Sequence, residues 1–383
     1  MFDLIVVGAG PAGSSAARRA GKLGLETFLL DKEQFPRYKA CGGGVTERAL
    51  SHLDFDLPID LWEATIFAAR VHYGNNSIEA SRSSPIARMV SRSAFDACLL
   101  EKASETGITV HMGERVIGLG QTNEAVEVST DEGTYEARFV IVAEGAQGTL
   151  KHRVRRRDRK DEYGVCLVAE IRNEEASPEY SQDAIDIHFG IGGMGYGWVF
   201  PHGEYYSLGI GGLANSLRRP KETMAGFLRD RGFDPNHRMR GHVIPVGGIR
   251  RTLASQRILL AGDAAGFLDS FTGEGIAYAI RSGQIAAEVI AASLSSGGDS
   301  EALREYRTIC EDEFGVNLRY SLHLAKLMNR VPSVFFRLLT GNQEVIDSFT
   351  KVATAQWTYK EYLKWLLSRL PKYLVRRQWI APE

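Results

Sequence analysis

The chain opens with Phe2-Asp3-Leu4-Ile5-Val6-Val7-Gly8-Ala9-Gly10-Pro11-Ala12-Gly13, the stretch that decides its fold. The apolar run before Gly8 is typical of a buried strand. Gly8 permits a tight turn, Gly10 lets the backbone approach a phosphate, and Gly13 lets the next helix pack close to the strand. The stretch therefore predicts a strand, turn and helix that bind the pyrophosphate of a dinucleotide.

A second apolar strand ends in a turn of small residues far downstream. It comprises Arg257-Ile258-Leu259-Leu260-Ala261, followed by Gly262-Asp263-Ala264-Ala265-Gly266. The Asp263 carboxylate is suited to accept hydrogen bonds from a ribityl chain. A cofactor that touches both ends of the sequence predicts FAD, bound by a domain whose segments are far apart in the chain.

The residues after the first turn complete a βαβ unit. Helical sequence from Ser14 to Leu23 leads to an apolar strand, Leu25 to Leu30, which ends at Asp31. Asp31 lies near the roughly 20-residue spacing expected for an acid that binds the adenosine ribose. The alternative interpretation is a glycine-rich loop that binds no ligand.

Composition narrows the class of protein. The chain has 383 residues, 44% hydrophobic and 24% charged, which suits two globular domains or one large domain with an insertion. A net charge of −1 argues against a general nucleic-acid binder. Four cysteines without a Cys-x-x-Cys pair predict neither a disulfide framework nor a metal site. We find no basic leader and no apolar run of about 20 residues, so we expect a cytoplasmic protein.

The pattern along the chain predicts an α/β fold. A polar hairpin is expected around Tyr73-Gly74-Asn75-Asn76, a β-rich stretch from about Tyr163 to Pro245, and helices from Thr272 onward. We expect a discontinuous Rossmann-type FAD-binding domain over 1–65, 85–160 and 245–300. A β-rich substrate domain is expected over 66–84 and 161–244, and a helical C-terminal region over 301–383.

Several motifs give the chain a family resemblance. It resembles the p-hydroxybenzoate-hydroxylase-like flavoproteins through Gly8–Gly13, Arg92-Ser93-Ala94-Phe95-Asp96, Ala143-Glu144-Gly145 and Gly262-Asp263. Within that group it is most similar to the geranylgeranyl reductase family. The motifs for this narrower match are Phe35-Pro36-Arg37-Tyr38-Lys39 before Cys41-Gly42-Gly43, Tyr196-Gly197-Trp198-Val199-Phe200-Pro201, and Asp269-Ser270-Phe271-Thr272-Gly273-Glu274-Gly275-Ile276. The resemblance spans roughly residues 1 to 290. The chain departs from the usual patterns at Glu144, where the group has Asp, and at Gly193, where the reductases often have Pro.

The resemblance implies a set of cofactor-binding residues drawn from these motifs. They are Gly8, Gly10, Ala12, Gly13, Asp31, Lys32, Cys41, Gly42, Gly43, Arg92, Gly262, Asp263, Gly273, Gly275 and Ile276. For Arg92 the alternative role is an ion pair with Asp96. Residues 272–276 predict a helix start whose N–H groups stabilise negative charge on reduced flavin. Glu274 is either a buried acid of the site or an ordinary residue of the helix cap.

Alternation places Tyr196, Trp198 and Phe200 on one face of a strand. Three aromatic side chains beside a flavin would form an apolar wall for a hydrophobic substrate. A core strand explains the same pattern. The resemblance favours the first interpretation and implies that these residues and Pro201 bind a prenyl chain. Cys41, Tyr196 and Trp198 are the candidate catalytic residues, although Cys41 is also explained as a small residue in a tight turn.

Two basic segments remain open to interpretation. The run from Lys151 to Lys160 is typical of a solvated face, and it could also attract the phosphates of NADPH. At the C-terminus, one helical face carries four leucines, and Pro371 is expected to end the helix. These leucines are Leu363, Leu366, Leu367 and Leu370, among basic and aromatic residues that include Arg376, Arg377 and Trp379. That arrangement suits either peripheral membrane contact or packing on the body of the protein.

These features predict an FAD-dependent reductase of isoprenoid double bonds, active in lipid biosynthesis. Hydride would come from reduced flavin, and NADPH or a ferredoxin-like protein would supply electrons. The expected partner is a hydrophobic isoprenoid, with no nucleic acid. The alternatives are an aromatic monooxygenase on the same scaffold and a flavoprotein that binds isoprenoid lipid without turnover. A flavin halogenase is disfavoured, because the sequence lacks a Trp-x-Trp-x-Ile-Pro element.

Overall fold

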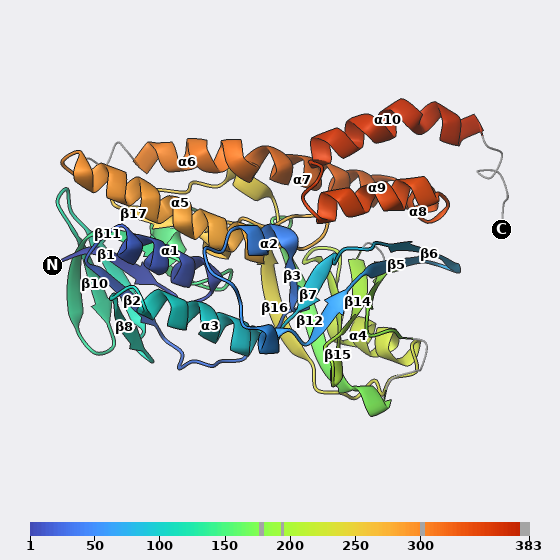
Figure 1. The fold of residues 1–383 in the computed structure, drawn as a ribbon, viewed down its shortest axis with the longest axis horizontal. Coiled ribbons are helices and arrows are strands. Elements are labelled where there is room, and N and C mark those ends of the chain that lie inside the picture. Colours follow the sequence, from blue (N-terminus) through green and yellow to red (C-terminus); the bar gives the residue numbers. More distant parts are fainter. Residues whose placement is uncertain (176–179, 193–194, 299–302, 376–383) are drawn as a thin grey trace.

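The computed structural model describes residues 1–175, 180–192, 195–298 and 303–375. Figure 1 shows two large sheets side by side, with a layer of C-terminal helices running along both. The mixed α/β class that the sequence predicts, with a helical C-terminal region, is confirmed.

The first sheet carries both glycine turns. Its strand order is β8-β2-β1-β11-β10-β9, and β17 also pairs with β11. The strands are β1 (Phe2–Val7), β2 (Thr27–Asp31), β8 (Thr109–Met112), β9 (Val116–Gln121), β10 (Val126–Thr130), β11 (Thr134–Val142) and β17 (Ile258–Leu260). Both β1 and β17 run parallel to β11, one on each side. Their carboxyl ends therefore meet at one edge of the sheet, which brings the two turns together.

Three helices pack around this sheet: α1 (Pro11–Lys22), α3 (Arg92–Ser104) and α5 (Ile276–Ser295). Helix α1 begins at Pro11, earlier than predicted, because proline is favoured in the first helical turn. Helices α1 and α5 approach so closely that a Cβ added at Gly283 would lie 2.1 Å from the Ala12 carbonyl oxygen. The predicted βαβ unit is confirmed.

The second sheet has the order β16-β12-β15-β14-β13-β5-β6. Its strands are β5 (Ala68–Tyr73), β6 (Asn76–Ser81), β12 (Tyr163–Arg172), β13 (Ala184–Ile191), β14 (Gly195–Pro201), β15 (Tyr205–Leu213) and β16 (Arg240–Pro245). The predicted hairpin is present, since Tyr73 pairs with Asn76. Helix α4 (Pro220–Arg229) covers one face, where Phe227 packs against Gly197.

Smaller elements connect these layers. A three-stranded sheet contains β3 (Gly44–Thr46), β7 (Ala87–Met89) and β4 (Ala64–Ile66), and the short helix α2 (Glu47–Ser51) follows β3. The C-terminal helices are α6 (Arg304–Cys310), the π-helical turn Glu311–Gly315, α7 (Val316–Arg330), α8 (Pro332–Thr340), α9 (Gln343–Ala353) and α10 (Tyr359–Val375). Among the described residues, no helix combines the length and apolar character needed to cross a bilayer.

The C-terminal helix differs from the prediction. Helix α10 continues through Pro371 instead of ending there. Proline removes one backbone hydrogen bond, and neighbouring turns with intact bonds on both sides can carry the helix past it. The predicted leucine face is also divided, because Leu366 is buried and Leu363 packs beside it, whereas Leu367 is 64% exposed. The side chain of Leu370 and residues Arg376, Arg377 and Trp379 lie outside the described part of the chain.

Candidate active site

A cavity of about 1000 Å³ lies between the carboxyl ends of the first sheet and one face of the second. Most of the residues predicted for cofactor and substrate line it. They are Gly8, Gly10, Ala12, Asp31, Lys32, Cys41, Gly42, Arg92, Tyr196, Trp198, Asp263, Gly273, Gly275 and Ile276. Gly13, Gly43, Phe200, Pro201 and Gly262 are not among its lining residues. The fold therefore collects one site from segments spread over most of the sequence.

Glycine is required for a different reason at each of three positions of the first turn. Gly8 has a φ of 103°, and a Cβ there would lie 2.5 Å from the Ala143 carbonyl oxygen. At Gly13 a Cβ would lie 1.6 Å from the Gly8 carbonyl oxygen, so this position is fixed by packing. Gly10 meets only the Arg37 guanidinium, at 3.5 Å, and it lines the cavity. The open space over Gly10 at the start of α1 fits a pyrophosphate.

Asp31 lies against this turn at the end of β2. One carboxylate oxygen accepts a hydrogen bond from the Ala9 N–H at 2.6 Å, and the other accepts one from the Glu33 N–H at 2.9 Å. These bonds hold the carboxylate beside the cavity, where its remaining lone pairs fit a ribose hydroxyl.

The second turn places Asp263 in the same cavity. Gly262 has a φ of 58°, and its N–H donates to the Ser282 hydroxyl at 2.9 Å. Burial raises the pKa of the Asp263 carboxyl, while the nearby Lys39 and Arg92 charges oppose that shift. A carboxylate surrounded by cations and facing a cavity can accept hydrogen bonds from the hydroxyls of a ribityl chain.

The loop that carries Cys41 is held by a buried ion network. Asp96 is fully buried and accepts hydrogen bonds of 2.9 Å from Arg92 Nε, from Arg92 Nη2 and from Arg37 Nη2. Arg92 thus makes the alternative ion pair with Asp96, and it also lines the cavity. The contact of Arg92 with a cofactor stays a prediction.

Aromatic side chains pack behind the Cys41 loop. A Cβ at Gly42 would lie 2.9 Å from the Phe200 ring, and a Cβ at Gly43 would lie 2.3 Å from the His202 ring. His202 Nδ1 lies 2.6 Å from Glu63 Oε2, and His202 Nε2 lies 2.9 Å from the Gly42 carbonyl oxygen. Phe200 and His202 therefore pack against the glycines of the loop without lining the cavity.

Strand β14 presents its aromatic residues on one face, as alternation predicts. The Tyr196 and Trp198 ring centroids are 5.8 Å apart, and those of Trp198 and Phe200 are 6.2 Å apart. Trp198 lies over Gly209, where a Cβ would meet the indole ring at 2.1 Å. The Tyr196 hydroxyl lies 3.0 Å from the position a Cβ would take at Gly273. Tyr196 and Trp198, with Cys166 and Val168, form an apolar wall of the cavity that the glycine turns also line.

Lys39 and His242 form a pair that the sequence did not reveal. Lys39 Nζ lies 2.9 Å from His242 Nδ1. Burial lowers the pKa of Lys39 to about 8, against the opposing effect of Asp263. Burial, together with the Lys39 charge, lowers the pKa of His242 to about 3. Lys39 is therefore the donor and His242 the neutral acceptor at neutral pH. Lys39 stands in a motif quoted above, but no local signal marks His242 on β16.

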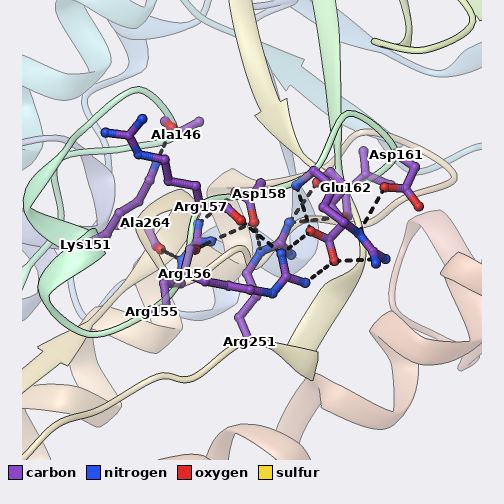
Figure 2. Close-up of polar contacts among 12 residues, drawn as sticks. Ala146, Lys151, Arg155, Arg156, Arg157, Asp158, Asp161, Glu162, Arg251 and Ala264 are labelled. Carbon is purple, nitrogen blue, oxygen red and sulfur yellow. Dashed lines mark hydrogen bonds and ion pairs between the residues drawn. The ribbon is translucent and has the colours of Figure 1, made fainter.

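The basic run from Lys151 to Lys160 is mostly exposed, as a solvated face would be, but Lys151 and Arg155 are buried. Figure 2 shows the polar contacts of this run. Arg155 donates from Nη1 to Asp158 at 2.7 Å and from Nε to the Ala264 carbonyl at 3.0 Å. Arg251 Nε donates to the same Asp158 carboxylate at 2.8 Å. This network anchors the turn that contains Asp263. Exposed members of the run, such as Arg157, stay available to an anionic ligand.

Two acids that the sequence left open acquire structural partners. Glu144 lines the cavity and accepts a hydrogen bond from the Lys151 N–H at 3.0 Å, and burial raises its pKa. Glu274 accepts hydrogen bonds from Arg48 Nη1 at 2.7 Å and from the Thr46 hydroxyl. Glu274 therefore ties the start of α5 to α2. Gly193, the other departure from the family pattern, lies outside the described residues.

The outer face of the second sheet brings together His72, Asp186 and His188, in a chain for which we predicted no metal site. His72 Nε2 lies 2.7 Å from Asp186 Oδ1. The two imidazole rings stack, with an interplanar angle of 12°, and Arg70 Nη2 lies 3.4 Å from the same carboxylate. Stacked rings cannot both aim a nitrogen lone pair at one ion, and the guanidinium already compensates the charge. None of the three residues lines the cavity, although β13 pairs with the strand that carries Tyr196 and Trp198.

Comparisons with known proteins agree with the features of the cavity. Residues 3–148 match the family described as FAD dependent oxidoreductase. The chain is 31% identical to a geranylgeranyl diphosphate reductase of Rhodobacter capsulatus, over 77% of this chain and 76% of the relative. It is 29% identical to a menaquinone reductase of Mycolicibacterium smegmatis, over 85% and 84% of the two chains. It is 28% identical to a digeranylgeranylglycerophospholipid reductase of Methanococcus vannielii, over 90% and 92%.

Solved structures share the fold. A geranylgeranyl bacteriochlorophyll reductase-like protein of Thermoplasma acidophilum superposes with a TM-score of 0.79 at 21% identity, covering 98% of each chain. The flavin-dependent brominase Bmp2 superposes with a TM-score of 0.74 at 20% identity, covering 97% of this chain and 99% of the brominase. One scaffold thus supports different flavin reactions, so the reaction has to be argued from the cavity.

Proposed function

Because this chain belongs to the geranylgeranyl reductase family of FAD-dependent oxidoreductases, we propose that it saturates carbon–carbon double bonds of a geranylgeranyl-type chain. The observation that carries the proposal is the apolar wall of Tyr196 and Trp198, which shares one cavity with the two glycine turns. Those turns would hold FAD, and the wall lies in the same cavity. A polyprenyl chain needs such an apolar surface, and it offers few polar groups to bind.

The substrate class follows from what the curated relatives have in common. Their names specify a geranylgeranyl diphosphate, a digeranylgeranyl glycerophospholipid and a menaquinone, which share an isoprenoid chain and differ in the headgroup. The wall formed by Tyr196, Trp198, Cys166 and Val168 has the chemistry for the shared part. We therefore assign the isoprenoid chain, and no particular headgroup, to this cavity.

Bound reduced FAD supplies the hydride chemistry, and the protein supplies position and a proton. Exclusion of water by the apolar wall favours an alkene held in a reactive orientation. Burial raises the pKa of the Tyr196 phenol, so the hydroxyl keeps its proton at any physiological pH. Tyr196 and Cys41 both line the cavity, and their hydroxyl and thiol are the two candidate donors of a proton to the second alkene carbon.

Electrons would come from NADPH or from a ferredoxin-like protein. The exposed arginines of the run that begins at Lys151 support the first donor, because Arg153 and Arg157 can pair with phosphate groups. They equally fit an acidic protein surface. Comparison of NADPH with reduced ferredoxin as the donor in a steady-state assay distinguishes the two.

The proposed function is tested by a substrate screen under anaerobic conditions. Purified protein with FAD is reduced by dithionite and given geranylgeranyl diphosphate, a digeranylgeranyl glycerophospholipid or a menaquinone, and the products are analysed by mass spectrometry. A gain of two hydrogens per double bond in at least one substrate supports the proposal. Oxygen consumption coupled to an aromatic substrate, with no saturation, would instead establish the monooxygenase. Tight FAD binding without any product would establish a binding protein.

A further inference from the structure

The segment from Phe314 to Gln343 includes all of α7 and α8 and contains no acidic residue. Three of its basic side chains, Lys326, Arg330 and Arg337, are exposed. None of the three has an ion-pair partner among the residues that the structure describes. Arg319, at the start of the segment, is different because it pairs with Glu311. The end of α7 and the start of α8 therefore present an uncompensated positive charge.

Apolar side chains emerge between these cations, at the bend where α7 ends and α8 begins. Leu327 is 47% exposed, Val331 is 40% exposed and Val334 is 52% exposed. Leu327 lies in the last turn of α7, Val331 lies at the junction of the two helices, and Val334 lies in the first turn of α8. We call Lys326, Leu327, Arg330, Val331, Val334 and Arg337 the α7–α8 elbow. Large apolar side chains are seldom exposed together on a helix that faces only water.

Packed aromatic rings connect this elbow to the wall of the cavity. Phe335, next to Val334, lies with its ring centroid 5.9 Å from that of Phe271. Phe271 belongs to the segment in which Leu268 and Gly273 line the cavity. Figure 1 shows α8 beside the hairpin of β5 and β6, at the end of the molecule that contains the second sheet. The elbow is thus the exposed end of a continuous apolar body that reaches the site.

We infer that the α7–α8 elbow is the surface by which this protein binds an anionic phospholipid bilayer. Its cations match negative headgroups, and its leucine and valines can insert among the acyl chains just beneath them. The contact would place the cavity near the lipid phase in which a polyprenyl substrate dissolves. The benefit of such a contact rests on the proposed function, because it assumes a lipid substrate. The binding surface itself is inferred from the exposed side chains alone. On α10, the helix for which the sequence predicted such contact, Leu363 and Leu366 pack against the protein and Leu367 is exposed.

The inference is tested by co-sedimentation of the FAD-bound protein with lipid vesicles. One set of vesicles contains phosphatidylcholine alone, and the other contains phosphatidylcholine mixed with phosphatidylglycerol. The charge variant is K326Q/R330Q/R337Q, and the matched control is R218Q/K221Q/R229Q, which removes three exposed charges near or on α4. The apolar variant is L327Q/V334Q, with L23Q/I59Q as its control for exposed apolar residues elsewhere.

We expect the wild-type protein and both controls to bind the mixed vesicles and to bind phosphatidylcholine weakly. Binding should fall about fivefold for each elbow charge removed, and roughly a hundredfold for all three. Loss in L327Q/V334Q would show that insertion contributes. Equal binding by elbow and control variants would overturn the inference, and so would concentration-dependent dimerisation through the elbow without vesicle binding. Retained FAD absorbance and reduction of geranylgeranyl diphosphate in detergent check folding, and they keep failure of the surface separate from failure of the proposed function.

Discussion

Replacement of Asp158 by Asn should destabilise the protein far more than a change of the same kind nearby. Asp158 compensates two guanidiniums whose side chains are almost inaccessible, Arg155 at 2% exposed and Arg251 at 9% exposed. Loss of the carboxylate charge leaves both buried guanidiniums without a compensating negative charge. This should lower the free energy of unfolding by about 3 kcal/mol. Asp161→Asn is the matched control. Its partner Arg159 lies 3.4 Å away with 68% of its side chain exposed, so the loss should stay below about 1 kcal/mol.

Urea unfolding of the FAD-free variants at neutral pH measures this difference, and its pH dependence identifies the cause. Burial alone would raise the pKa of Asp158, but hydrogen bonds from Arg155 and Arg251 outweigh it and hold the pKa below the ordinary 3.8. Because the pKa of Asp158 is lower in the folded than in the unfolded protein, its ionised carboxylate stabilises the fold. This stabilisation is fully present above the unfolded-state pKa and is lost as the pH falls through the folded-state pKa. The gap between wild type and Asp158→Asn should therefore be constant from pH 7 to 5 and shrink below about pH 4. A gap no larger than that of Asp161→Asn would refute the reasoning.

Other substitutions separate packing, cofactor binding and catalysis. Gly13→Ala should cost about 3 kcal/mol of stability because its Cβ would clash with backbone, whereas Gly10→Ala should leave the urea midpoint unchanged and weaken FAD binding about tenfold or more. Equal effects of the two on FAD affinity at unchanged stability would contradict this assignment. Tyr196→Phe should slow alkene reduction about 10- to 100-fold with FAD retained, and unchanged turnover would eliminate Tyr196 as the proton donor. FAD affinity should fall as the pH rises through about 8, where Lys39 loses its charge, and fluorescence titration of Lys39→Met should show no such fall.

Local signals in the sequence predicted the parts of the site that are built locally. The turn at Gly8–Gly13 was predictable because its glycine spacing is a local pattern. Gly8 and Gly13 avoid clashes with backbone, and Gly10 leaves open space at the start of α1. The common face of Tyr196, Trp198 and Phe200 follows from strand alternation alone, and the structure has these rings in contact. The α/β class followed from the order of such segments.

Contacts between distant segments escaped the prediction. Arg155 is buried beside Asp158, whose carboxylate also binds Arg251, a residue 93 positions further along the chain. His242 meets Lys39 because β16 pairs with β12, and no local pattern specifies that pairing. At Pro371 the local rule was overridden, since the helix continues beyond it.

The most direct test of the central claim is one anaerobic turnover with geranylgeranyl diphosphate in detergent. Enzyme-bound FAD is first reduced with dithionite, and no other electron donor is present during the reaction. Reoxidation of the flavin and saturation of the product are then measured in the same sample. The account predicts one double bond saturated for each FAD reoxidised. Flavin that stays reduced beside unchanged prenyl substrate, and is reoxidised only when oxygen is admitted, would contradict it.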